Sequence, residues 1–108
     1  MNPSDIIREL AELTQTNRKG VEALYEAETN LAGAENRLDE IYAKSFLAAS
    51  GSIAERSEIA KLESAAARLE RDLNKAQVNR VRTKIRVIES AIMAQATMSK
   101  IMQAEMKL

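Results

Sequence analysis

Basic side chains gather in one stretch of the second half of the sequence. Five of them, with no acidic residue among them, lie between residues 73 and 88: Lys75, Arg80, Arg82, Lys84 and Arg86. On a helix, Arg82 and Arg86 lie one turn apart, and so do Arg80 and Lys84. Such rows can bind the phosphates of a nucleic acid. The stretch has no aromatic residue on which a base could stack, so this chemistry would be independent of nucleotide sequence.

The residue types in the rest of the sequence exclude most kinds of catalytic site. The chain has no histidine and no cysteine, which removes histidine-based triads, thiol nucleophiles, zinc clusters and histidine-containing di-iron sites. Gly20, Gly33 and Gly51 are isolated, so no glycine-rich phosphate loop is present. We therefore predict a protein that is not an enzyme, with no catalytic, cofactor-binding or metal-binding residues.

The composition is that of long helices. Hydrophobic residues make up 45% of the 108 residues but aromatic residues only 3%, so the core must be a thin seam of aliphatic side chains. No apolar run approaches the ~18 residues of a membrane span, and no signal peptide is evident. We expect a single cytoplasmic domain with no membrane contact.

Glycine, serine and proline mark the ends of the expected helices. Pro3 suits the start of a helix. Gly51 suits a helix C-terminus, and Ser52 with Glu55 forms the pattern of a capping box. A lesser break is expected near residues 14–18, where the sequence becomes polar before Gly20. The prediction is a short helix over about 4–14, a helix over about 17–49, a turn at 50–52 and a long helix over about 53–107.

Heptad spacing predicts how these helices pack. Leu24, Leu31 and Leu38 are seven residues apart, and Ala27, Ala34 and Ile41 form the adjoining stripe. In the second helix a stripe is expected to run along Ile59, Leu62, Ala66, Leu69 and Leu73, and then to slip in phase to Val81, Ile85, Ile88 and Ile92. The fold predicted for residues 1–108 is thus an all-α, antiparallel, coiled-coil-like two-helix hairpin with a short N-terminal helix.

The two halves of the sequence have opposite charge. Residues 1–50 hold five bases and nine acids, whereas residues 51–108 hold 11 bases and seven acids. Folding about Gly51 is expected to place Glu22, Glu26 and Glu28 opposite the basic stretch and Glu22 opposite Arg80. We therefore favour a solvated, ion-paired role for the basic residues, with nucleic-acid contact as the alternative.

The C-terminal part of the second helix is too apolar for one partner helix. Two neighbouring apolar stripes occur there, and Lys100 is the one charged residue between Ser90 and Ala104. We predict a helical-bundle homo-oligomer, a dimer or tetramer, whose interface contains Ile85, Ile88, Ala91, Ile92, Met98, Ile101 and Met102. The alternative is that the Met-rich end is an adaptable surface for another protein partner.

Two segments of the sequence carry a family resemblance. One is Tyr42–Arg56, in which an aromatic-containing helix end precedes the Gly-Ser turn and a Glu-Arg pair; the other is Ala67–Leu73, rich in Arg and Leu. Together they resemble small helical proteins of bacteriophages and prophages, encoded in early regions near replication and recombination functions. The resemblance spans roughly residues 20–95 and implies no particular catalytic activity. It implies a bacterial cytoplasm, or the host-cell cytoplasm for a phage-encoded protein.

Three functions are compatible with these features. The favoured one is a non-enzymatic oligomeric interaction or assembly module, accessory to phage DNA metabolism. The second is a sequence-independent nucleic-acid-binding protein that uses the basic stretch. The third is a small helical chaperone or inhibitor that holds a protein partner through the Met-rich end.

Overall fold

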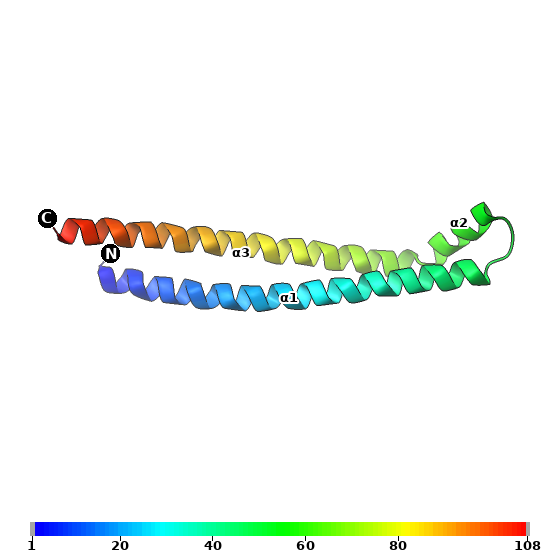
Figure 1. The fold of residues 1–108 in the computed structure, drawn as a ribbon, viewed down its shortest axis with the longest axis horizontal. Coiled ribbons are helices and arrows are strands. Elements are labelled where there is room, and N and C mark those ends of the chain that lie inside the picture. The colour runs from blue at the N-terminus through cyan, green and yellow to red at the C-terminus, as the bar shows by residue number, and fades with distance from the viewer. Residues whose placement is uncertain (1, 108) are drawn as a thin grey trace. The chain divides into compact units, whose positions relative to one another are not determined.

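The chain is all-helical in the computed structural model, which describes residues 2–107. Helix α1 spans Pro3–Ala48, α2 spans Ile53–Glu63 and α3 spans Ala65–Met106, and these described residues contain no strand (Figure 1). The all-α prediction is therefore confirmed. Asn2 caps α1, since its side-chain Oδ1 accepts the Asp5 backbone N–H at 3.0 Å.

The helices contribute to two compact units. Unit 1 contains the start of α1, up to Leu24, and α3 from Arg80 onward. Unit 2 is Tyr25–Asn79, which comprises the rest of α1, the turn, α2 and the start of α3. Contacts within each unit join helical segments that run in opposite directions.

The turn of unit 2 has the predicted chemistry. α1 ends at Ala48 and α2 begins at Ile53, so the turn expected at 50–52 is confirmed (Figure 1). Gly51 has φ +108°, a left-handed conformation that favours glycine. Ser52 caps α2, because its side-chain oxygen accepts the Glu55 backbone N–H at 3.2 Å.

The break expected near residues 14–18 is absent, because α1 is one helix through that stretch. The threonines there do not cap a new helix; the hydroxyls of Thr14 and Thr16 donate to the carbonyls of Leu10 and Glu12, at 2.8 and 2.9 Å. Asn17 and Gly20 are partly buried at heptad spacing with Leu13. Packing against α3 in unit 1 thus outweighs the weak helix propensity of these residues.

The long second helix is instead interrupted at Ser64, which separates α2 from α3. Ser64 is completely buried, and its hydroxyl donates to the Ala60 carbonyl at 2.6 Å. Back-bonding of this kind bends helices. The Arg68 guanidinium donates to the same hydroxyl at 3.1 Å, which holds the serine in place.

The break changes the register of the helices in unit 2. Near the turn, the Tyr42 and Ser57 hydroxyls are 3.0 Å apart, and beyond Ser64 the Arg37 guanidinium donates to the Glu70 carboxylate. The two contacts are five residues apart on α1, from Tyr42 to Arg37, but thirteen residues apart on the returning chain, from Ser57 to Glu70. In unit 1, Gly20 lies against Ile85, whereas the prediction placed residue 82 opposite it.

The seam of unit 1 is aliphatic with polar insertions. Ile6, Val81 and Ile85 are buried. The remaining seam residues are half-buried: Leu10, Leu13, Asn17, Gly20 and Leu24 on α1, and Ile88, Ile92, Gln95, Ser99 and Met102 on α3. On both helices the spacing alternates between three and four residues, as in a coiled coil.

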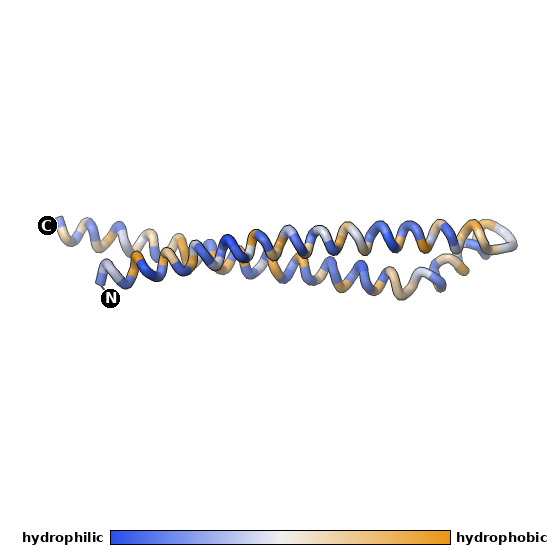
Figure 2. The backbone as a smooth tube through the Cα atoms, turned by 90° about the horizontal axis from the view of Figure 1, so that it is seen from below, coloured by the Kyte–Doolittle hydropathy of each residue, from blue (hydrophilic) through white to orange (hydrophobic). Residues whose placement is uncertain are grey.

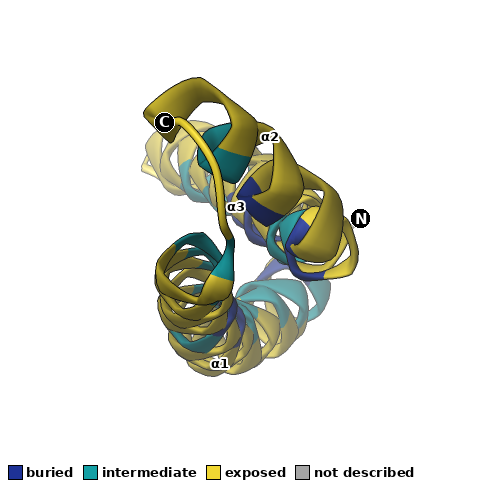
Figure 3. Cartoon of the chain, turned by 90° about the vertical axis from the view of Figure 1, so that its right-hand side faces the viewer, coloured by how far each residue is buried: buried dark blue, intermediate teal, exposed yellow. Residues whose placement is uncertain are grey.

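The seam of unit 2 is built from small residues. Ala27 and Ala34 of α1 are buried, as predicted, with Leu31 and Leu38 half-buried at their heptad positions, whereas Ile41 of the predicted stripe is 39% exposed. The returning chain buries Ala60, Ser64, Ala67 and Val78. Figure 3 shows these buried segments on the facing sides of the helices, with exposed residues outside. Small side chains let helix backbones approach closely.

The stripe predicted for this part of the second helix is therefore wrong. Ile59, Leu62, Ala66, Leu69 and Leu73 are all exposed, and their smaller neighbours form the seam. No phase slip is needed, because Ala60, Ser64 and Ala67 begin a three-four spacing that reaches Val78, Val81 and Ile85 unchanged. The sequence contains two stripes where one slipping stripe was predicted.

Candidate interaction surfaces

An exposed apolar stripe runs along α2 and the start of α3 in unit 2. We call it the outer stripe; it consists of Ile59, Leu62, Ala66, Leu69, Leu73 and Ala76. Leu62, Leu69 and Leu73 are 78%, 61% and 62% exposed, and Ile59 is 37% exposed. Figure 2 shows hydrophobic positions recurring along this part of the chain. The three-four spacing of the outer stripe is that of a helix-packing surface.

The predicted oligomer interface in unit 1 divides into two sets. Ile85 is buried and Ile88, Ile92 and Met102 are half-buried in the seam against α1, with Ala91 half-buried beside them. Met98 and Ile101, in contrast, are 45% and 54% exposed. Of the predicted interface residues, Met98 and Ile101 are therefore the two that one copy leaves exposed.

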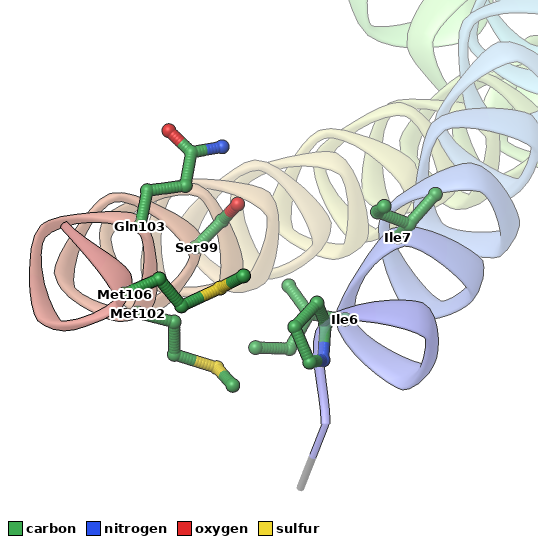
Figure 4. A pocket seen from close by; sticks show the side chains of 7 residues that line it. Ile6, Ile7, Ser99, Met102, Gln103 and Met106 are labelled. Atoms are coloured by element: carbon green, nitrogen blue, oxygen red, sulfur yellow. The ribbon is translucent and has the colours of Figure 1, made fainter.

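The end of unit 1 has a small apolar cavity of about 80 Å³. Its lining comes from the first turn of α1 and the last turns of α3, and consists of Pro3, Ile6, Ile7, Ser99, Met102, Gln103 and Met106. Figure 4 shows Met102 and Met106 on the α3 side of this space and Ile6 on the α1 side. The space is smaller than a typical small-molecule site.

The basic residues are exposed but do not form one row. Lys75 belongs to unit 2, and Arg80, Arg82, Lys84 and Arg86 belong to unit 1. In the heptad set by the seam, Arg86 lies on one side of the exposed face of α3, and Arg80 and Lys84 lie across it. Arg82 already interacts with another group of the protein.

The predicted acidic partners of the basic residues are placed differently. Among residues 2–107, neither Glu22 nor Glu26 forms an ion pair, so the expected Glu22–Arg80 pair is absent. The ion pair found between α1 and α3 in unit 2 has the opposite polarity: Arg37 of α1 pairs with Glu70 of α3. Both side chains are about half exposed, so this pair contributes at most about 1 kcal/mol.

An aromatic cluster supports the turn of unit 2. The Tyr42 and Phe46 rings stack with centroids 6.4 Å apart, and the Arg56 guanidinium carbon lies 4.5 Å from the Phe46 ring centre. Arg56 also donates from Nε to the Phe46 carbonyl at 3.1 Å, which satisfies an acceptor at the end of α1. These contacts place Tyr42, Phe46 and Arg56 at the corner where the chain reverses direction.

Comparison with protein-family models, curated proteins and solved structures found no match for this chain. Within residues 2–107, no helix is long and apolar enough to cross a membrane, and no three carboxylates are grouped to hold a metal ion.

The outer stripe contains the residues that sequence reasoning misplaced. Its leucines were predicted to face α1 because large aliphatic side chains normally fill a core. The signal that separates the two stripes was present in the sequence: Ala60, Ser64 and Ala67 match the small residues Ala27 and Ala34 of α1. Small residues facing small residues bring two helices close together and turn the larger neighbours outward.

Proposed function

We propose that this protein is a non-enzymatic helical assembly module that works as a homo-oligomer in the cytoplasm. The resemblance of Tyr42–Arg56 and Ala67–Leu73 to small phage proteins favours a role accessory to phage DNA metabolism. In this proposal the chain is a coiled-coil-like hairpin that supplies one layer of a larger bundle.

The exposed outer stripe is the observation that supports this proposal. A single copy leaves four large aliphatic side chains of the stripe in water: Ile59, Leu62, Leu69 and Leu73. Complete burial of such a side chain from full exposure is worth about 1.5–3 kcal/mol, and these four are 37–78% exposed, so covering each one contributes part of that. Exposed apolar residues at heptad spacing on α2 and on the start of α3 are suited to contact with another helix, whereas an enzyme would need an enclosed polar site.

Sedimentation of the full chain tests the proposal. We expect the wild-type protein to have a mass above the 12.0 kDa of one chain at micromolar concentration. Leu69→Asp with Leu73→Asp should reduce the mass to that of a monomer and leave most helicity by circular dichroism, because both residues are exposed within one chain.

The matched control adds the same charge elsewhere. Ala32→Asp with Ala43→Asp, at exposed positions of α1, should leave the mass unchanged. A well-folded wild-type monomer at micromolar concentration would refute the assembly function.

A second candidate function is sequence-independent binding of nucleic acid. It is favoured by the exposure of Lys75, Arg80, Lys84 and Arg86, none of which forms an ion pair with a described residue. Binding by phosphate contacts would weaken steeply with salt.

Fluorescence anisotropy with single- and double-stranded oligonucleotides across a salt series tests this candidate. Submicromolar, salt-sensitive binding that Lys84→Glu with Arg86→Glu abolishes would establish it. The same reversal at Arg18 and Lys19, two exposed bases of α1, is the control. Affinity no better than the roughly 10⁻⁴–10⁻⁶ M of non-specific contacts would exclude it.

A further inference from the structure

A shallow groove runs along one side of unit 1, between α1 and α3. It contains an open depression of about 500 Å³ lined by Glu9, Glu12, Leu13, Thr16, Ala91 and Gln95. Met98 follows Ala91 by one heptad and Asp5 precedes Glu12 by one heptad, so the same side of both helices continues toward the end of unit 1. We call this side of unit 1 the unit 1 groove.

The α3 wall of the unit 1 groove is apolar. Its residues alternate between four- and three-residue spacing within one uninterrupted helix, and they are Val87, Ala91, Ala94, Met98 and Ile101. Val87, Met98 and Ile101 are 65%, 45% and 54% exposed. The wall extends over about 21 Å, or about four helical turns, and its spacing is that of a helix-packing surface.

The α1 wall of the unit 1 groove is acidic. Asp5, Glu9 and Glu12 follow one another at four- and three-residue spacing on the side of α1 next to the apolar wall. Gln95 of α3 donates from Nε2 to the Glu9 carboxylate at 2.6 Å, which holds that carboxylate at the groove. Asp5 pairs with Arg8 of the same helix, but neither Glu9 nor Glu12 forms an ion pair among residues 2–107. The groove thus has two carboxylates with no basic partner in the described part of the chain.

A second copy of the chain fits this groove poorly. Ala91 and Gln95 border the same depression as Glu9 and Glu12, so the middle of the apolar wall lies beside these two acids. An antiparallel pair that stacks one apolar wall on the other would bring the acids of both copies together. A parallel pair would instead place the acidic wall of each copy on the apolar wall of the second copy. Like charges oppose association in the first case, and burial of unpaired carboxylates is costly in the second.

We propose that the unit 1 groove binds an amphipathic helix of another protein, one that carries Lys or Arg along one edge. The apolar side of that helix packs on the α3 wall, and its basic edge lies next to Asp5, Glu9 and Glu12. Complementary charge determines which edge of the bound helix faces α1, and the flexible Met98 side chain adapts the wall to the residues packed on it. All of these residues belong to unit 1, so the inference goes beyond the self-association proposed for the outer stripe and does not depend on it.

Two designed peptides test this inference on the full chain. Both are about four to six helical turns long and have leucines at three- and four-residue spacing; one has lysines along the edge beside the leucines, and the other has glutamates there. Fluorescence anisotropy should show micromolar binding of the basic peptide and binding of the acidic peptide that is weaker by about tenfold or more. The basic peptide should also gain helicity on binding, because an isolated helix of this length is marginal in water.

Substitutions on each wall of the groove locate the site. Glu12→Lys should weaken binding of the basic peptide by about tenfold and strengthen binding of the acidic peptide. Glu22→Lys changes an exposed acid of α1 outside the groove, so it is the matched control for net charge and should leave both affinities nearly unchanged. Met98→Asp with Ile101→Asp should weaken binding of both peptides. Helicity should stay at the wild-type level in all three variants, because each changed residue is exposed.

The outer stripe separates this inference from the proposed function. Leu69→Asp with Leu73→Asp, in unit 2, should leave the affinity for the basic peptide unchanged even as it lowers the mass of the oligomer. A wild-type monomer that binds the basic peptide through the groove would refute the assembly function and leave this inference standing.

Three results would overturn the inference. The first is the absence of micromolar binding, or equal affinity for the two peptides. The second is binding that the outer-stripe variant abolishes and the groove variants do not, which would place the peptide in unit 2. The third is a lower sedimenting mass for Met98→Asp with Ile101→Asp, which would show that a second copy of the chain occupies the groove.

Discussion

Polar side chains in the seam of unit 1 are costly to stability and restrict how the helices can pair. Gln95 donates from Nε2 to the Glu9 carboxylate at 2.6 Å, but its Oε1 and the Oδ1 of Asn17 are buried without a hydrogen-bond partner among the described residues. Each such atom costs about 1–3 kcal/mol. Buried amides in heptad seams restrict register, because a slipped pairing would bury them against aliphatic side chains. These two residues therefore lower the stability of unit 1 and make the pairing of its helices more specific.

Two glycines within α1 should respond differently to replacement by alanine. A Cβ at Gly33 would have Arg37 Nη1 at 3.5 Å, an ordinary contact, so Gly33→Ala should stabilise the fold by about 0.5–1 kcal/mol through helix propensity. At Gly20 the new Cβ would lie 3.1 Å from Ile85 Cγ1, so the same change should gain less than Gly33→Ala or destabilise the fold.

Urea unfolding at one fixed protein concentration measures both variants, since an oligomer's stability depends on concentration. Equal stabilisation by the two alanines would show that Gly20 does not serve close packing.

At the scale of elements, local chemistry predicted the turn well. Gly51 and Ser52 act on their immediate neighbours, so their roles can be derived from sequence spacing. The break at Ser64 could not be derived in this way, because serine within a helix bends the chain only when its hydroxyl bonds to a carbonyl and its surroundings accept the bend. Thr14 and Thr16 make similar bonds in α1 without a break.

The turn supplies a prediction about a single element. Gly51→Ala should destabilise the fold by about 1–2 kcal/mol, since φ +108° is strained for a side chain. The added Cβ would also lie 2.4 Å from Glu55 Oε2, which would force that side chain to move. In urea unfolding, the free energy of unfolding should fall for Gly51→Ala and rise for Gly33→Ala. A neutral result at Gly51 would mean that the turn adopts another conformation in solution.

At the scale of the whole molecule, the helical class followed from composition, and the seam of α1 followed from its leucine and alanine repeat. The choice between two stripes on the returning chain did not follow, because hydrophobicity ranks Leu69 above Ala67 as a core residue. The buried residues are instead the small ones, Ala27 and Ala34 on α1 and Ala60, Ser64 and Ala67 on the returning chain, and this match depends on both helices together. The interface residues Ile85 and Ile88 were displaced for the same reason: the seam with α1 uses them first.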